Sequence, residues 1–209
     1  MKVFVTGGTG FIGARLTEKL IGDNHEVTLL ARNPSMVPYA GNERVTVIKG
    51  DLSDKEILKK GMKSCDWVFH MAAYAKPSFS DPSVVTSINI DGTVNVFEAA
   101  LESGVRKVVF TSTGGTMSYS HDGMPVDEET NKNPELHTLY EKTKAEAEKI
   151  AVDYKTKGRD VVIVNPTRVY GPGRLSESNS VTRIIKLYMS GLWRINPGDG
   201  SSTGNYVYV

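Results

Sequence analysis

Short apolar segments alternate with longer amphipathic segments along most of the chain. The apolar segments are rich in β-branched residues, which predicts strands at residues 2–6, 26–31, 45–49, 67–71, 107–112 and 160–165. The amphipathic segments predict helices near residues 11–22, 54–63, 83–103, 137–157 and 181–191. This alternation predicts an α/β fold, a doubly wound parallel sheet covered by helices on both faces.

Two polar segments interrupt the alternation, one over residues 114–136 and one that begins at residue 165. Loops of this length in a compact domain are often functional. His121 and His137 lie in or beside the first loop and are candidates for contact with a substrate. The chain stops inside a strand-like run, residues 205–209, without a polar tail. We therefore expect the C-terminal region to be incomplete, with a genuine terminal strand as the alternative.

The composition is that of a globular protein and excludes several classes of function. The chain has 209 residues, of which 39% are apolar and 23% charged, which fits one domain or one domain plus part of another. The net charge of +1 gives no electrostatic reason to expect nucleic acid or a membrane as partner. A single cysteine, Cys65, excludes an internal disulfide. Without a signal peptide, a membrane-length apolar run or zinc-ligand spacing, we predict a cytoplasmic, metal-free protein.

Four glycines, Gly7, Gly8, Gly10 and Gly13, directly follow the first predicted strand and overlap the start of a helix. Strand, glycine-rich turn and helix together form the dinucleotide-binding fingerprint. A side chain at Gly7 or Gly10 would hold a pyrophosphate away from the turn, and Gly13 would let the helix pack close to the strand. The helix N-terminus offers unpaired N–H groups to a phosphate. The sequence therefore predicts a dinucleotide cofactor.

The segment TGGTGFIG, with its glycines at positions 7, 10 and 13, resembles the extended short-chain dehydrogenase/reductase family, also called the epimerase/dehydratase superfamily. The resemblance covers nearly the whole chain and is greatest toward dihydroflavonol-reductase-like and 3β-hydroxysteroid-dehydrogenase-like members. It implies a Rossmann domain over residues 1–170, which binds NAD(P), and the start of a small substrate lobe over residues 171–209. It also implies a homodimer formed through the helix over residues 137–157.

The cofactor contacts are predicted from the strand ends and from this resemblance. Asp51 resembles the family's aspartate at the adenine edge, although an aspartate here could also cap the next helix. The segment NPTRVYGPG resembles the family's RPxxVYGPG, which lies by the nicotinamide, with Asn165 in place of the arginine. The predicted contacts are Gly7, Gly10, Phe11, Ile12, Gly13, Arg32, Asp51, Leu52, Met71, Ala72, Ala73, Tyr140, Lys144, Pro166 and Thr167.

The residues after the second predicted strand bear on which nicotinamide is used. An NAD site places an acid about 20 residues beyond the glycine turn, where it binds the ribose 2′-hydroxyl. No Asp or Glu occurs between Val27 and Asn42, and Arg32 stands near the expected position of the acid. A guanidinium suits a 2′-phosphate. We therefore predict NADP, with NAD as the alternative and a solvated surface arginine as the non-functional reading.

Tyr140 and Lys144 are four residues apart on a predicted helix, so they share one face. Their place after the fifth strand resembles the family's YxxxK pair, which implies that Tyr140 exchanges a proton with substrate and that Lys144 holds the cofactor ribose. A free tyrosine has a pKa near ~10, and both a nearby ammonium and the positive ring of an oxidised nicotinamide favour the phenolate. We therefore expect the pKa of Tyr140 to be lowered. The alternative is a surface tyrosine beside a solvated lysine.

A third donor would orient the oxygen of the substrate. The fifth strand ends in VVFTSTGGT, and the family resemblance implies a catalytic hydroxyl at Thr113. Ser112 is the second candidate, because strand alternation sends the two side chains to opposite faces. Two other polar residues are predicted to be structural. His70 lies within an apolar strand, and Asn89, which matches the family's NxxGTxN stretch, would tie its helix to the active-site strands.

These observations favour an NADP-dependent reductase that acts on a carbonyl or hydroxyl of a small molecule, with Thr113, Tyr140 and Lys144 as catalytic residues. An NAD-dependent nucleotide-sugar epimerase or dehydratase is the alternative. It would use the same residues but would be expected to carry an acid near Ala31. A third reading, a cofactor-sensing regulator without catalysis, is disfavoured by the Tyr140–Lys144 pair.

Overall fold

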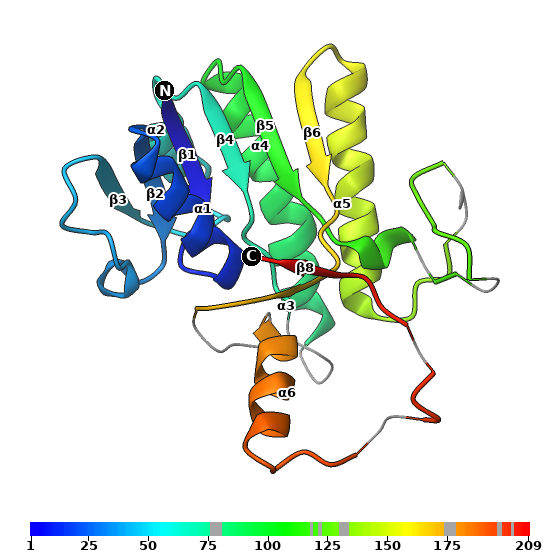
Figure 1. The fold of residues 1–209 in the computed structure, drawn as a ribbon. Helices are drawn as coiled ribbons and strands as arrows, with labels where there is room; N and C mark the ends of the chain where they lie inside the picture. The colour runs from blue at the N-terminus through cyan, green and yellow to red at the C-terminus, as the bar shows by residue number, and fades with distance from the viewer. Residues whose placement is uncertain are drawn as a thin grey trace.

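The strands of the main sheet occupy the predicted positions to within one residue at each end. The structure is a computed structural model and describes residues 1–75, 81–117, 119–120, 123–129, 134–173, 179–195, 198–201 and 203–209. In this part of the chain, six parallel strands follow the order β3-β2-β1-β4-β5-β6 (Figure 1). They are β1 (Lys2–Thr6), β2 (Glu26–Ala31), β3 (Val45–Lys49), β4 (Trp67–His70), β5 (Lys107–Thr111) and β6 (Asp160–Val164). The predicted α/β fold is confirmed.

The strand order reverses at β1, which pairs with β2 on one side and with β4 on the other. The chain first runs outward from β1 to β3 and then crosses back to β4. In open parallel sheets, ligands bind outside the carboxyl ends of the strands at such a reversal. The ends of β1 and β4 are therefore the part of the sheet where a site is expected.

The helices agree with the prediction except between β4 and β5. There the helix predicted over residues 83–103 is divided into α3 (Pro82–Thr86), a π-helical turn η2 (Ser87–Asp91) and α4 (Gly92–Glu102). The other helices are α1 (Phe11–Gly22), α2 (Lys55–Met62), α5 (Leu139–Thr156) and α6 (Ser180–Met189), with short 3-10 turns η1 (Pro34–Met36) and η3 (Gly114–Met117). None of the described helices is both long and apolar enough to cross a membrane.

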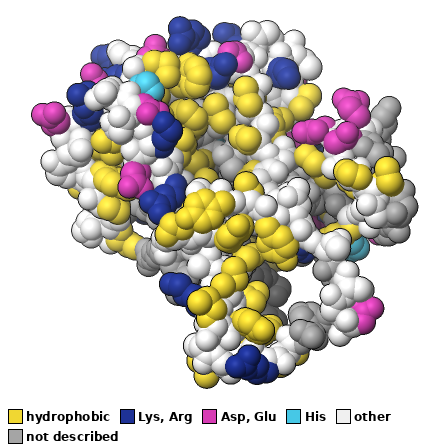
Figure 2. All heavy atoms as spheres, viewed as in Figure 1, with side chains coloured by type: hydrophobic (Ala, Val, Ile, Leu, Met, Phe, Trp, Pro, Cys, Tyr) yellow, Lys and Arg dark blue, Asp and Glu magenta, His cyan; other side chains and the backbone are white. Residues whose placement is uncertain are grey.

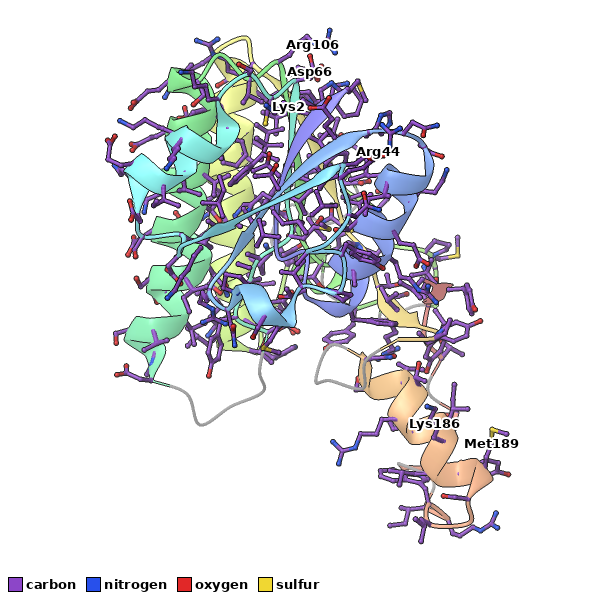
Figure 3. All side chains as sticks on the ribbon, turned by 90° about the vertical axis from the view of Figure 1, so that its left-hand side faces the viewer. Lys2, Arg44, Asp66, Arg106, Lys186 and Met189 are labelled. Carbon is purple, nitrogen blue, oxygen red and sulfur yellow. The ribbon has the colours of Figure 1, made fainter. Side chains whose placement is uncertain are left out.

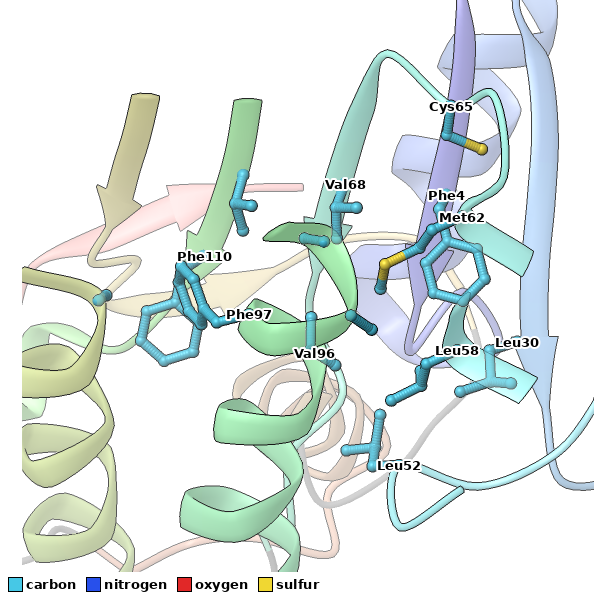
Figure 4. Packing of buried hydrophobic residues seen from close by; sticks show 14 of the residues in the cluster. Phe4, Leu30, Leu52, Leu58, Met62, Cys65, Val68, Val96, Phe97 and Phe110 are labelled. Carbon is cyan, nitrogen blue, oxygen red and sulfur yellow. The ribbon is translucent and has the colours of Figure 1, made fainter. Parts of the chain in front are cut away.

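Alternation along β1 sends its side chains to two separate cores. Phe4 lies in a cluster with side chains of α2, α4 and α5, in which Phe97 and Phe110 meet edge to face (Figure 4). Val3 and Val5 point the other way, toward α1. Figure 3 shows the layer of α2, α4 and α5 on one side of the sheet and α1 on the other.

The face of β6 that points away from α5 is exposed. Val162 is 41% and Val164 is 44% exposed, while Val161 on the opposite face is buried. Figure 2 shows hydrophobic side chains gathered over this part of the sheet. Helices therefore cover both faces of the sheet at β1 and β2, as expected. In the described part of the chain they do not cover both faces at β6, because α1 packs only against the other half of the sheet.

The C-terminal part of the chain forms a small second sheet and a projecting helix. β7 (Arg168–Tyr170) was not predicted, and it pairs in parallel with β8 (Tyr206–Tyr208), which lies within the strand-like run. Helix α6 extends away from the main sheet, and its Met189 is exposed (Figure 3). The division of the chain at residue 170 stays a prediction.

Candidate active site

A cavity of about 670 Å³ lies at the carboxyl ends of the strands, where the order reverses. Its walls come from the glycine turn, the ends of β2 to β5, the first turn of α5 and the segment after β6. With the exception of Lys144, every predicted catalytic or cofactor-contacting residue lines it: Gly7, Gly10, Phe11, Ile12, Gly13, Arg32, Asp51, Leu52, Met71, Ala72, Ala73, Thr113, Tyr140, Pro166 and Thr167. Residues far apart in the sequence thus share one cavity.

The three glycines of the turn are needed for different reasons. Gly7 has a φ of +74°, and a Cβ there would come within 2.6 Å of the Ala72 nitrogen. A Cβ at Gly13 would overlap the carbonyl oxygen of Gly7, so α1 packs close to the turn as predicted. At Gly10 a Cβ would meet only the Gly7 oxygen, at 3.1 Å. At Gly7 the backbone that follows β4 therefore already requires glycine, a reason that the sequence did not predict, while room for a pyrophosphate stays a prediction.

The N-terminus of α1 is open toward the cavity. Gly10 is the N-cap residue and supplies no side-chain hydrogen bond, and the first turn contains no acidic residue. Phe11, Ile12 and Gly13 line the cavity, so the unpaired N–H groups of the first turn lie beside it. This arrangement fits a phosphate group, since both the N–H groups and the helix dipole favour negative charge.

Arg32 and Asp51 lie at neighbouring strand ends on the cavity wall. Arg32 is exposed and directly follows buried Ala31, the last residue of β2. The carboxylate of Asp51 accepts a hydrogen bond from the Ser53 N–H at 3.2 Å. Asp54, not Asp51, caps α2, because its carboxylate accepts from the Ile57 N–H. The alternative role for Asp51 as a helix cap is therefore excluded.

Helix α5 brings Tyr140 to the cavity and buries Lys144 beneath it. A capping box between Thr138 and Glu141 fixes the start of the helix. Lys144 is 1% exposed, and its Nζ donates to the carbonyl oxygen of Thr111 at 2.9 Å. The same Nζ lies 4.0 Å from the centre of the Phe110 ring. Lys144 therefore faces β5 and does not line the cavity.

The pKa values of this pair follow from burial. Burial raises the pKa of Tyr140, whereas the sequence predicted that it would be lowered. That expectation is wrong for the chain as described, because burial decides the direction in which the pKa of Tyr140 is shifted. Burial also lowers the pKa of Lys144 to about 7, against the opposing effect of the Glu148 carboxylate.

The turn after β5 carries two hydroxyl groups that differ in exposure and in hydrogen bonding. Thr113 is partly exposed, and its Oγ1 accepts a hydrogen bond from the Gly115 N–H at 3.2 Å. Ser112 is 3% exposed, and its hydroxyl has no hydrogen-bond partner among the described residues. Thr113 is therefore the better placed of the two to meet a ligand in the cavity.

A buried hydrogen-bond network joins the glycine turn to α5. His70 accepts from the Thr6 hydroxyl at Nδ1 (2.7 Å) and contacts the Thr93 hydroxyl at Nε2 (3.1 Å). Since Thr93 itself donates to the Asn89 carbonyl, Nε2 of His70 is assigned as the donor. The predicted core role of His70 is confirmed.

Asn89 completes the network inside the π-helical turn. Its amide bonds both backbone groups of Tyr74 and donates to the Thr143 hydroxyl at 3.0 Å. Thr143 in turn donates to the carbonyl oxygen of Tyr140. The predicted structural role of Asn89 is confirmed, because it ties the segment after β4 to the helix that carries Tyr140.

The burial of His70 predicts a loss of stability in mild acid. Desolvation lowers the pKa of His70 to about 3, so the folded chain keeps it neutral while the unfolded chain protonates it below about 6.5. Stability is therefore present above that pH and falls by about 1.4 kcal/mol per pH unit as the pH drops toward 3. Urea unfolding at pH 6.5 and 5 should show a loss of about 2 kcal/mol.

His70→Gln is expected to reduce this pH dependence, while His137→Gln, at an exposed position, should leave it unchanged. Equal stability of the unaltered chain at both pH values would show that His70 is not held neutral.

Several polar residues of the site were not found from the sequence. The Glu148 carboxylate accepts from the Asn165 amide at 2.7 Å and from the Thr116 hydroxyl at 2.9 Å. Asn165, which stands where the family has arginine, therefore contacts α5. Nε2 of His137 lies 4.0 Å from Oε2 of Glu135, and His137 does not line the cavity. His121 lies outside the described residues. No cluster of metal-ligating side chains occurs in the described part of the chain.

Comparison with known families agrees with this arrangement. Residues 3–209 match the model of the NAD dependent epimerase/dehydratase family. The chain belongs to that family. The resemblance inferred from the glycine turn and the Tyr140–Lys144 spacing is therefore confirmed at the level of the family.

Relatives within the epimerase/dehydratase family include both reductases and epimerases. A putative dihydroflavonol 4-reductase of Synechocystis sp. is 34% identical over 81% of this chain and 49% of its own. A UDP-glucose 4-epimerase of Mycolicibacterium smegmatis is 32% identical over 100% of this chain and 70% of its own. The structure of the UDP-glucose 4-epimerase of Thermus thermophilus in complex with NAD superposes with a TM-score of 0.84, at 31% identity, over 100% of this chain and 70% of that one.

The chain thus spans about half the length of the Synechocystis relative and about 70% of the two epimerases. The family match over residues 3–209 contains every residue of the cavity wall, from Thr6 to Val169.

Proposed function

We propose that the cavity binds a nicotinamide dinucleotide and that the protein reduces the carbonyl of a small organic molecule with NADPH. One observation carries this proposal: Tyr140 and Thr113 line the same cavity as the open N-terminus of α1. A cofactor whose phosphates lie at α1 would extend along the strand ends toward Tyr140. The Gly10 backbone and Arg32 would hold the phosphates, and Met71, Ala72 and Thr167 would border the rest.

The roles of the chain's own residues follow from their protonation states. When bound, the nicotinamide supplies the hydride. Tyr140 is protonated at neutral pH, since its pKa is raised, and it donates this proton to the oxygen of the substrate. Thr113 donates a second hydrogen bond to that oxygen. The charge of Lys144, one turn further along α5, stabilises the phenolate that remains. The family's expected contact between Lys144 and the ribose stays part of this proposal.

Arg32 supports NADPH as the cofactor. It is exposed on the cavity wall at the end of β2, where an NAD site would carry an acid. The second candidate is an NAD-dependent nucleotide-sugar epimerase or dehydratase. It is favoured by the two epimerase relatives, one of them solved with NAD. The homodimer and the cytoplasmic location stay predictions.

Removal of Arg32 is expected to abolish a preference for NADPH. We expect the unaltered chain to bind NADPH at least about tenfold more tightly than NADH, because one charge-assisted pair with the 2′-phosphate contributes more than about 1.4 kcal/mol. Arg32→Ala should bind both equally, as measured by cofactor fluorescence. Arg44→Ala is the control, since Arg44 lies at the opposite end of the sheet (Figure 3).

Two results would contradict the NADPH assignment. One is equal or tighter binding of NADH by the unaltered chain, and the other is NAD that stays bound through purification. Either result would favour the epimerase or dehydratase candidate, and nucleotide sugars would then be the substrates to assay.

A further inference from the structure

Glu148 lies on the same face of α5 as the two catalytic candidates of that helix. Tyr140, Lys144 and Glu148 are spaced four residues apart, and such residues stack along one side of a helix. Glu148 does not line the cavity and has no role in the mechanism above. Its carboxylate is half-buried and accepts hydrogen bonds from two side chains outside α5.

Those two side chains hold the turn that carries Thr113. Thr116 Oγ1 and Asn165 Nδ2 each contact the Thr113 carbonyl oxygen, at 2.8 and 3.2 Å, and each contacts Glu148 Oε1. One carboxylate oxygen thus links α5, the turn η3 and the residue after β6. The Thr113 carbonyl is therefore held by a cluster in which Glu148 takes part, together with the backbone N–H of Thr116.

The charge of Glu148 is not cancelled by these donors, since a hydroxyl and an amide are both neutral. Lys144 lies one helical turn away, and its own contacts, the Thr111 carbonyl and the Phe110 ring, carry no full charge. Glu148 acts on Lys144 in the direction that favours the ammonium, while burial opposes it. The other titratable groups near Lys144 are Tyr140 on α5 and His70 on β4, both uncharged at neutral pH.

We propose that Glu148 is a positioning residue that keeps Lys144 charged and, through Thr116 and Asn165, orients Thr113. The proposal rests on the proposed function, because it gives Glu148 its effect through the residues that act on the substrate. The presence of an asparagine and not an arginine at position 165 also fits this role of Glu148. A neutral amide at this position leaves the carboxylate free to act on Lys144, whereas an arginine would pair with it.

The test separates charge from hydrogen bonding. Glu148→Gln keeps an oxygen that can accept from Thr116 and Asn165 but removes the charge. We expect the titration midpoint of Lys144 to fall by about half to one pH unit. It is followed by NMR of labelled lysine side chains and assigned through Lys144→Arg. If turnover is detected, its alkaline limit should move down by the same amount. Glu146→Gln, at an exposed position of α5, should change neither.

Glu148→Asp retains the charge and should leave the titration midpoint of Lys144 unchanged. It is therefore the control for a general effect of substitution at this position. An unchanged midpoint in Glu148→Gln would overturn the proposal, and so would an equal fall in Glu148→Asp. The titration needs neither cofactor nor turnover. Failure of the proposed function would instead appear as absence of NADPH binding by the unaltered chain, which leaves the titration readable.

Discussion

Tyr140→Phe is expected to lower the turnover of carbonyl reduction by about 10²- to 10⁴-fold, the usual contribution of a positioned general acid. The ring still fills its place at the cavity wall, so the affinity for NADPH should not change. Measurement of kcat together with the Kd for NADPH separates the two effects. A loss in kcat alone is the expected signature, because the proton is transferred only in the chemical step.

Tyr154→Phe is the matched control on the same helix. Tyr154 packs on Phe97, with ring centres 4.9 Å apart, and it does not line the cavity. Its hydroxyl should be dispensable for turnover. Full activity in Tyr140→Phe would show that another group supplies the proton, and Ser112 or Thr113 would be the next residues to replace.

Gly13→Ala is expected to destabilise the fold by about 3 kcal/mol, the upper end of what overpacking costs. The added Cβ would overlap the carbonyl oxygen of Gly7, which is backbone and belongs to a turn held against β4. Relief would require α1 to move away from the sheet. Urea unfolding measures the loss directly, and cofactor binding should weaken as well because the N-terminus of α1 would shift.

Gly22→Ala provides the comparison within the same helix. Nothing lies within 4 Å of a Cβ at Gly22, so this change should leave the free energy of unfolding unchanged or raise it by about 0.5 kcal/mol. Equal stability of the two variants would mean that the turn and α1 are less closely packed than described.

Most of the fold could be predicted because its signals are local. The strands are short apolar runs between turns, and the parallel arrangement follows from the alternation with helices. Parallel strands also place their carboxyl ends at one edge, so residues such as Arg32, Ala72 and Thr113 could be assigned to one site before any contact was known. The pairing of β7 with β8 could not, because each strand has three residues and they are far apart in the sequence.

The parts of the site that were missed depend on side-chain contacts between distant segments. Lys144 turns toward the Thr111 carbonyl because α5 packs against β5. The spacing of residues within the helix does not reveal this packing. The pKa of Tyr140 was predicted in the wrong direction, because nearby positive charge was given more weight than the burial of the hydroxyl. Glu148 and Asn165 are 17 residues apart and meet only after β6 has paired. The substitution of the family's arginine by Asn165 was the one signal of this contact.

The π-helical turn between α3 and α4 fixes how many residues the chain must have there. A π-helical turn holds one residue more than the corresponding stretch of α-helix, so the loss of one residue from Ser87–Asp91 would convert the segment into regular α-helix and displace Asn89. Asn89 reaches Tyr74 and Thr143 only at the present spacing. A single-residue deletion here would therefore weaken the link between the segment after β4 and the helix of Tyr140, and it would also displace Ile88, which lines the cavity.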